Sequence, residues 1–274
     1  SNIVDITNYV MLELGQPLHA FDLDDIKYNK MTVKMAEEGE KFTTLDGVER
    51  TLTSDMLVIG NQDKTLDLAG IMGGENSEIK DTTTSIFIEG ASFAKENIRA
   101  TSKKLGLRTE ASSRFEKGID INLAEEAVNR ACQLIEELGC GTVLNGMLDY
   151  YPQKEEVQKV TVNPVRINKL LGVNVPMDQF INILESLEFK CNLVSSEVLE
   201  LEVPTFRLDI TEDADILEEI ARIYGYNNIP SASLEGNATA GVKTDKQKFI
   251  DNVKSNSIAC GLNEILTYSF VSPR

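Results

Sequence analysis

Residues 55–74, DMLVIGNQDKTLDLAGIMGG, decide the fold class of the first half of the chain. Two short apolar runs flank the polar residues 61–64, a pattern typical of neighbouring strands joined by a tight turn. Outward from this stretch, residues 31–36 (MTVKMA) alternate, and residues 43–52 (TTLDGVERTL) contain the Asp-Gly signal of a hairpin. Residues 85–93 (SIFIEGASF) add another apolar, β-branched run. We therefore expect a mostly antiparallel sheet.

Helical patterns follow the predicted sheet. Residues 94–105 and 122–138 are predicted to form helices, and each pattern stops at a glycine, which commonly ends a helix. Residues 142–152 (TVLNGMLDYYP) return to a strand-like pattern. The sequence therefore predicts an α+β domain over residues 1–152, with a mixed or antiparallel sheet and helices.

A second domain is predicted after a polar, charged linker at residues 152–159. A strand at residues 160–162 is followed by two helices that each open at a proline, two short strands, and a helix at residues 213–224. This order resembles a small winged-helix-like α+β module. We place the module at residues 153–231.

The last residues predict only part of a third unit. A loop-rich stretch at residues 226–242 precedes an amphipathic helix at residues 245–261 and a strand-like run after it. Because this is too little for a domain, we interpret residues 232–274 as the truncated start of one. The chain is then a piece of a longer protein, with no secretory leader at its start.

The composition excludes several classes of protein. Apolar residues make up 42% of the chain, but no run is long enough for a membrane helix. The four cysteines are far apart and form no CxxC pair, which disfavours zinc and favours a cytoplasmic location. The net charge of −17 opposes tight nucleic-acid binding through the general field of this chain.

DNA binding is disfavoured for a second reason. The helix that would enter a DNA groove contains Asp178, Glu185 and Glu188 but no arginine or lysine. A scaffold or subunit-contact role fits this module better.

Several polar residues of the first domain are candidates for a site. His19, the only histidine, lies close to Gln16 and follows Asn8, and such groups can orient a water or a hydroxyl. Glu89 lies among apolar neighbours, where a carboxylate needs a partner. The structural alternatives are a hydrogen-bonded histidine and a glutamate on the solvent face of a strand. Gly73 permits close approach of the backbone to a ligand.

A second group of candidates is acidic: Asp209, Asp215, Glu218 and Glu219. The last three are spaced to share one helix face, and such oxygen ligands suit Mg²⁺. The alternative is that acids in the first turns of a helix interact with its dipole and need no metal.

Five stretches, taken in order, resemble the β subunit of bacterial phenylalanyl-tRNA synthetase: DITNYVMLELGQPLHAFD, AGIMGGENSEI, FIEGASF, GLRTEASSRFEKG and VPTFRLDITEDADILEEIARIYGYNNIP. The resemblance implies an editing module, the winged-helix-like module, and the start of a catalytic-like but inactive domain. It implies post-transfer editing, the hydrolysis of mischarged Tyr-tRNA(Phe). The parent enzyme would be an α2β2 heterotetramer that attaches phenylalanine to tRNA with ATP, using the α subunit.

The resemblance implies that Glu89 recognises the tyrosine hydroxyl, with Gly73 as a bare backbone wall and Thr109 and Ala111 on the other side of the pocket. A pocket for phenylalanine rejects an added hydroxyl only about 100-fold, so a second site must recognise that hydroxyl. A carboxylate in an apolar pocket accepts the phenol proton. Phenylalanine would leave the carboxylate buried and unpaired, which costs about 1–3 kcal/mol.

The resemblance places Thr7, Asn8 and His19 where the family holds the terminal adenosine of tRNA(Phe) and the hydrolytic water. Whether His19 polarises this water or only orients it stays open. The resemblance also implies that the four acidic residues bind Mg²⁺ together with the α subunit. The alternative function is a non-catalytic subunit scaffold or RNA-binding module with a vestigial pocket.

Overall fold

The computed structural model describes residues 1–27, 30–61, 63–232, 236 and 240–273. Ser1–Pro230 form one compact unit and Ser231–Arg274 form a second, and each is described by itself. The predicted α+β class is confirmed, because helices accompany strands that are all paired antiparallel in the described part of the chain.

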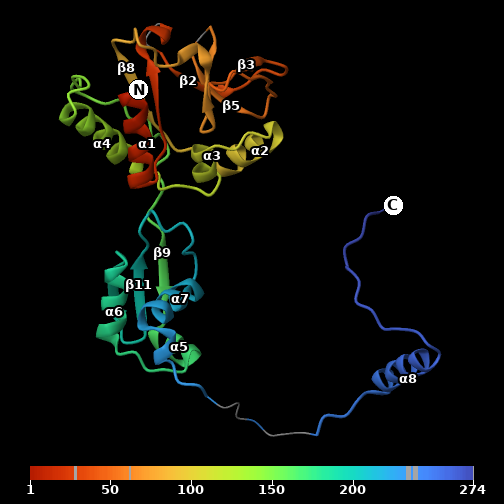
Figure 1. Cartoon of the computed structure of the whole chain (residues 1–274). Helices are drawn as coiled ribbons and strands as arrows, with labels where there is room; N and C mark the ends of the chain where they lie inside the picture. The colour runs from red at the N-terminus through yellow and green to blue at the C-terminus, as the bar shows by residue number, and fades with distance from the viewer. Residues whose placement is uncertain (28–29, 62, 233–235, 237–239, 274) are drawn as a thin grey trace. The chain divides into compact units, whose positions relative to one another are not determined.

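The strands of the N-terminal part form three small sheets (Figure 1). The four-stranded sheet has the order β2 (Thr32–Met35), β5 (Leu57–Gly60), β6 (Thr65–Leu68) and β7 (Met72–Gly73). The Asp-Gly hairpin predicted from the sequence is β3 (Lys41–Thr43) and β4 (Glu49–Thr51). The third sheet pairs β1 (Leu18–Asp22) with β8 (Ile86–Gly90), and it carries two residues of the candidate site.

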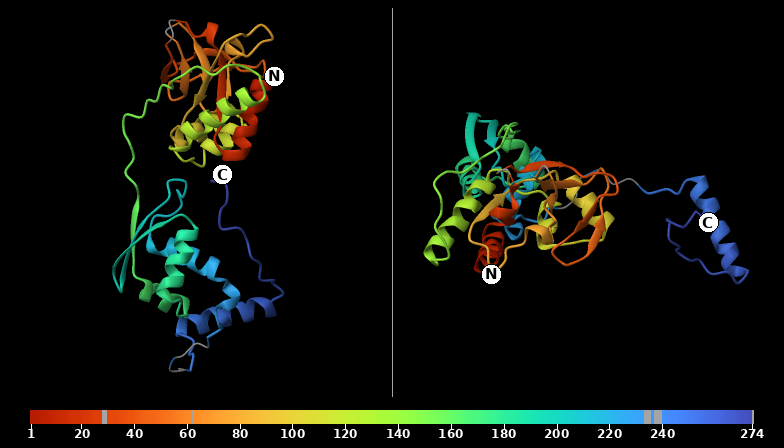
Figure 2. Two further views of the ribbon diagram at one scale, coloured as in Figure 1. Left: turned by 90° about the vertical axis from the view of Figure 1, so that its left-hand side faces the viewer. Right: turned by 90° about the horizontal axis from the view of Figure 1, so that it is seen from above.

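Helix α1 (Asn2–Leu14) lies beside α4 (Leu123–Glu137), as Figures 1 and 2 show from different sides. Ile6 and Val10 of α1 are buried in one cluster with Ala127 and Ala131 of α4. The sequence analysis did not identify α1, because its β-branched residues are poor helix formers; this packing compensates for them. The predicted helix at 122–138 is confirmed.

The remaining helical segments of this part are short. They include α2 (Lys95–Leu105), which is the helix predicted at 94–105, α3 (Glu110–Phe115), and the 3₁₀ turns Leu23–Asp25 and Glu75–Ser77. Helix α2 ends at Leu105 and is followed by Gly106, whose φ of +62° is the left-handed conformation expected of a glycine after a helix.

The strand predicted at residues 142–152 is wrong. These residues contain no strand, and Leu144 and Leu148 are 82% and 93% exposed. A strand-like run needs a neighbouring strand to bind its backbone groups, and no described strand pairs with it. The apolar composition of residues 142–152 therefore does not correspond to a strand.

Residues 159–228 follow the predicted order. They comprise β9 (Lys159–Val162), α5 (Pro164–Leu171), α6 (Met177–Ser186), β10 (Lys190–Ser195), β11 (Val198–Glu202), α7 (Asp213–Tyr224) and the 3₁₀ turn Tyr226–Asn228. The sheet has the order β10-β11-β9. Residues 159–228 have an apolar core of their own, in which Phe180, Leu199 and Ile216 are fully buried. The boundary predicted between residues 152 and 153 stays a prediction.

The C-terminal unit contains helix α8 (Asp245–Ala259), which begins at a capping box formed by Thr244 and Gln247. None of its residues is buried. The strand predicted after it is wrong, since residues 261–273 contain no strand. The loop-rich boundary predicted at 226–242 lies partly outside the described residues. Among the helices described, none is both long and apolar enough to cross a membrane.

Candidate functional site

Strand pairing brings together the two residues that carried the sequence-based hypothesis. His19 of β1 lies directly opposite Glu89 of β8 in the antiparallel register. Directly opposite residues in an antiparallel pair project to the same side of the sheet. Gln16 ties the ends of these strands together, because its amide nitrogen donates hydrogen bonds to the carbonyl oxygens of Pro17 and Ala91, each at 2.9 Å.

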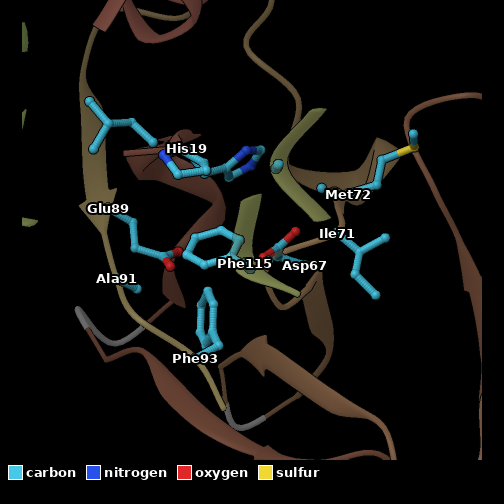
Figure 3. Close-up of a pocket in the computed structure, with 13 residues that line it drawn as sticks. His19, Asp67, Ile71, Met72, Glu89, Ala91, Phe93 and Phe115 are labelled. Atoms are coloured by element: carbon cyan, nitrogen blue, oxygen red, sulfur yellow. The ribbon is translucent and has the colours of Figure 1, made fainter. Parts of the chain in front are cut away.

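Both side chains line a cavity of about 60 Å³ (Figure 3). This is several times the space that one water molecule needs. Most of the wall is apolar, and it includes Ile71, Met72, Phe93 and Phe115. Phe93 and Phe115 meet edge to face, with ring centroids 5.1 Å apart. The cavity therefore presents aromatic and aliphatic surface with a few polar groups, as pockets for aromatic ligands usually do.

Glu89 is an acceptor without a donor. Its Oε2 atom is buried and has no hydrogen-bond partner among the described residues. Burial raises the pKa of the Glu89 carboxyl to about 8, and the neighbouring Asp67 adds to the rise. The alternative of a glutamate on the solvent face does not fit this position. A buried carboxyl with an unmet acceptor is available to a ligand hydroxyl.

Asp67 is a wall residue that the sequence analysis missed. It lies on β6, where every residue is buried, and it is only 4% exposed. Burial raises the pKa of its carboxyl, and the nearby His19 partly offsets the rise. The available signal was the sequence TLDLAG, in which a single acid interrupts an apolar run, just as Glu89 does in SIFIEG.

Gly73 forms the wall next to the His19 ring. A Cβ atom at this position would lie 2.5 Å from His19 Cε1 and 2.8 Å from Nε2. Such distances are too short for unbonded atoms, so the ring can occupy its place only because residue 73 has no side chain. The expected role of Gly73 as a bare backbone wall for a substrate stays a prediction.

We expect the substitution Gly73→Ala to displace the His19 ring. His19 is the only histidine, so its imidazole gives one set of ring signals in an NMR spectrum of the full chain. These signals should shift in Gly73→Ala and stay in place in the control Gly241→Ala, where nothing lies within 4 Å of the added atom. Unchanged His19 signals in both variants would contradict the close approach.

Of the other predicted site residues, some lie at the cavity and some do not. Ala111 lines the cavity. Thr109 caps α3, and its hydroxyl donates a hydrogen bond to the carbonyl oxygen of Ile71 at 2.9 Å. Thr109 therefore holds a residue of the cavity wall in place. Thr7 and Asn8 lie on α1 and are not part of the cavity wall: Thr7 is buried and bonds Val4, while Asn8 is exposed. Their roles toward adenosine stay predictions.

Two of the four predicted magnesium ligands, Asp209 and Glu219, bind arginines in this chain. Arg207 Nε and Nη2 donate to the two carboxylate oxygens of Asp209 at 2.9 and 2.7 Å, and its Nη1 donates to Glu219 at 3.1 Å. Arg222 also binds Glu219, at 2.6 Å. The Arg207 guanidinium holds the pKa of the Asp209 carboxyl below its usual value.

The remaining two acids do not complete a metal site. Asp215 Oδ2 accepts backbone hydrogen bonds from Thr211 and Glu212 at the start of α7, and Glu218 lies on the same helix. Among the described residues, no three potential ligands come together around one point. The four carboxylates as they stand in this chain therefore do not fit a magnesium ion, and magnesium binding stays a prediction.

Three family models match successive parts of the chain. The B3/4 domain matches residues 1–140, the tRNA synthetase B5 domain matches residues 160–226, and the phenylalanyl tRNA synthetase beta chain CLM domain matches residues 229–274. The cavity, including His19, Asp67 and Glu89, lies entirely within the first of these matches.

Two relatives of this chain are phenylalanine–tRNA ligase beta subunits. Phenylalanine–tRNA ligase beta subunits of Clostridium tetani and Clostridium acetobutylicum are 49% and 48% identical over 274 residues, which is all of this chain and 34% of each relative. The chain thus spans about a third of the length of these relatives. A crystal structure of an N-terminal fragment of the phenylalanyl-tRNA synthetase beta-subunit from Pyrococcus horikoshii covers 82% of this chain and 65% of its own, at 21% identity and a TM-score of 0.43.

The first family model covers half of the chain, and the relatives are similar from its first residue to its last. The chain therefore belongs to the B3/4 domain family, and along its whole length it is similar to phenylalanine–tRNA ligase beta subunits.

Proposed function

We propose that the cavity is the hydrolytic site of a post-transfer editing domain, which removes tyrosine from mischarged Tyr-tRNA(Phe). The observation that carries this proposal is the buried Glu89 Oε2 atom, which has no partner among the described residues and faces an apolar cavity opposite His19. A phenol hydroxyl would donate the missing hydrogen bond, whereas the ring of phenylalanine has nothing to donate.

The reaction requires one water. Its oxygen would bond to the carbonyl carbon of the tyrosyl ester, the bond from that carbon to the ribose oxygen would break, and a proton would pass to the ribose oxygen. His19 is the group we propose to hold this water, because it lies across the strand pair from Glu89. Fixing the water beside a reactive ester accounts for much of the rate. Asn8 and Thr7 are proposed to contact the terminal adenosine.

The whole protein would do more than this segment. We propose that the parent β subunit assembles with an α subunit into an α2β2 enzyme, binds tRNA(Phe), and supports ATP-dependent attachment of phenylalanine at the α subunit. The names of the relatives support this part of the proposal. Magnesium at the acidic positions would require Arg207 to release Asp209, and both Arg207 and Arg222 to release Glu219.

The test is hydrolysis of Tyr-tRNA(Phe) and Phe-tRNA(Phe) by the assembled enzyme that contains this sequence. We expect Tyr-tRNA(Phe) to be hydrolysed much faster, and His19→Ala to lower that rate by about 100-fold, the scale of one positioned acid–base or water-holding group. Attachment of phenylalanine should be unaffected. If the wild-type enzyme hydrolyses Tyr-tRNA(Phe) no faster than buffer does, the pocket is vestigial and the proposal fails.

A further inference from the structure

The cavity holds two carboxyl groups, and the proposed function uses only one of them. Asp67 reaches the cavity from β6 and Glu89 from β8, and Figure 3 shows both carboxylates turned toward its interior. Neither the Asp67 carboxyl nor Glu89 Oε2 receives a hydrogen bond from a described residue. Both groups therefore lack the donors that normally stabilise a buried carboxylate.

Two such groups cannot both be ionised near neutral pH. Like charges in a cavity with apolar walls repel each other with little screening, so one carboxyl of the pair retains a proton. The titratable groups that face Glu89 are His19 on β1 and Asp67 on β6, and the rest of the described wall is apolar or glycine. One imidazole does not neutralise two carboxylates.

We infer that Asp67 and Glu89 share one proton in the ligand-free pocket, and that Asp67 thereby sets the pH range in which Glu89 acts as an anionic acceptor. In this role Asp67 acts through Glu89. When a phenol donates to ionised Glu89, the shared proton moves to Asp67 or leaves for solvent. The proton sharing itself does not depend on the proposed function, whereas its consequence for tyrosine recognition does.

The direct test is a ligand-free titration of the full chain, with the glutamate and aspartate side-chain carboxyl carbons labelled and followed by NMR. Glu89 should titrate near pH 8 in the wild type. In Asp67→Asn its midpoint should fall by about one pH unit, because the neighbouring charge is gone. The control Asp63→Asn removes the same charge from an exposed position in the turn that precedes β6, and it should leave the Glu89 midpoint in place.

The pair gives a second readout. Glu89→Gln leaves Asp67 as the one carboxyl of the described cavity wall, so the step near pH 8 should disappear and a single carboxyl step should remain at lower pH. A structural role for Asp67 would change stability but would not lower the Glu89 midpoint in Asp67→Asn. If the Glu89 midpoint is the same in the wild type and in Asp67→Asn, with both folded, the shared proton is excluded.

The functional consequence has its own measurement. In the assembled enzyme, the pH profile of Tyr-tRNA(Phe) hydrolysis should move to lower pH by the same amount in Asp67→Asn, with Asp63→Asn unchanged. Shifted NMR midpoints without Tyr-tRNA(Phe) hydrolysis would sustain the proton pair and overturn only the proposed function. An unmoved rate profile with shifted midpoints would show that Asp67 does not set the range of recognition.

Discussion

Replacing Glu89 by alanine is expected to lower the rate of Tyr-tRNA(Phe) hydrolysis by about 100-fold, while attachment of phenylalanine continues. The reason is that a hydrogen bond to a charged group contributes about 1.5–3 kcal/mol, and alanine leaves the phenol hydroxyl without an acceptor. The rate should be measured at about pH 8 or above, where the Glu89 carboxyl becomes ionised. The substrates are Tyr-tRNA(Phe) and Phe-tRNA(Phe).

Two further variants make this result specific. Glu89→Gln keeps the size of the side chain and an acceptor oxygen but no charge, so it should retain more activity than Glu89→Ala. Glu126→Gln makes the same chemical change at an exposed position of α4 and should behave like the wild type. If Glu89→Ala hydrolyses Tyr-tRNA(Phe) at the wild-type rate, Glu89 does not recognise the hydroxyl.

The second large effect is on stability. The Glu89 carboxyl has a pKa of 4.5 in its ordinary state and about 8 in the folded chain. Between these values the folded chain holds more protons than the unfolded chain does, so the free energy of unfolding falls as the pH rises through this window. Each pKa unit corresponds to 1.36 kcal/mol, so the loss between pH 5 and pH 8 is on the order of 3 kcal/mol. The raised pKa of Asp67 acts in the same direction.

Urea unfolding followed by circular dichroism at pH 5 and pH 8 measures this loss. Carboxyls with lowered pKa, such as those of Glu38, Asp46 and Asp209, lose their stabilising effect only below their ordinary pKa, so they do not contribute in this window. Glu89→Gln should remove most of the difference between the two pH values, and Glu126→Gln should keep it. Equal free energies of unfolding at pH 5 and pH 8 in the wild type would contradict a buried, proton-binding Glu89.

The sequence predicts those elements whose signals are local. The hairpin of β3 and β4 has its Asp-Gly turn, α2 has its terminal glycine, and α7 matches the predicted helix at 213–224 residue for residue. The two incorrect strands, at 142–152 and after residue 261, were predicted from apolar composition alone. A strand forms only where a second strand binds its backbone, and the sequence of one segment does not identify that second strand.

The site was predictable only in part, because it too depends on which strands pair. Glu89 and His19 each stood out as a single residue, but their direct opposition depends on β1 pairing with β8 across about 70 residues of sequence. Asp67 was missed because its hairpin pattern explained it as an ordinary polar residue. Only the fold reveals that β6 is buried along its whole length.

The acidic cluster illustrates a different limit. The spacing of Asp215, Glu218 and Glu219 indicates one helix face but does not say which cation lies there. In this chain the cations are Arg207 and Arg222, which bind Asp209 and Glu219 through charge-assisted hydrogen bonds. The sequence contained both arginines, but the distances that decide the pairing come from the folded chain.

The central claim is that an otherwise apolar cavity distinguishes two aromatic amino acids by a single hydroxyl. The most direct measurement is calorimetric titration of the full chain with adenosine that carries tyrosine, or phenylalanine, through a non-hydrolysable 3′-amide. We predict that the tyrosyl compound binds at least about 10-fold more tightly, the difference of roughly one hydrogen bond to a charged group, and that Glu89→Ala abolishes this difference. Equal affinities of the wild-type chain for the two compounds would contradict the account.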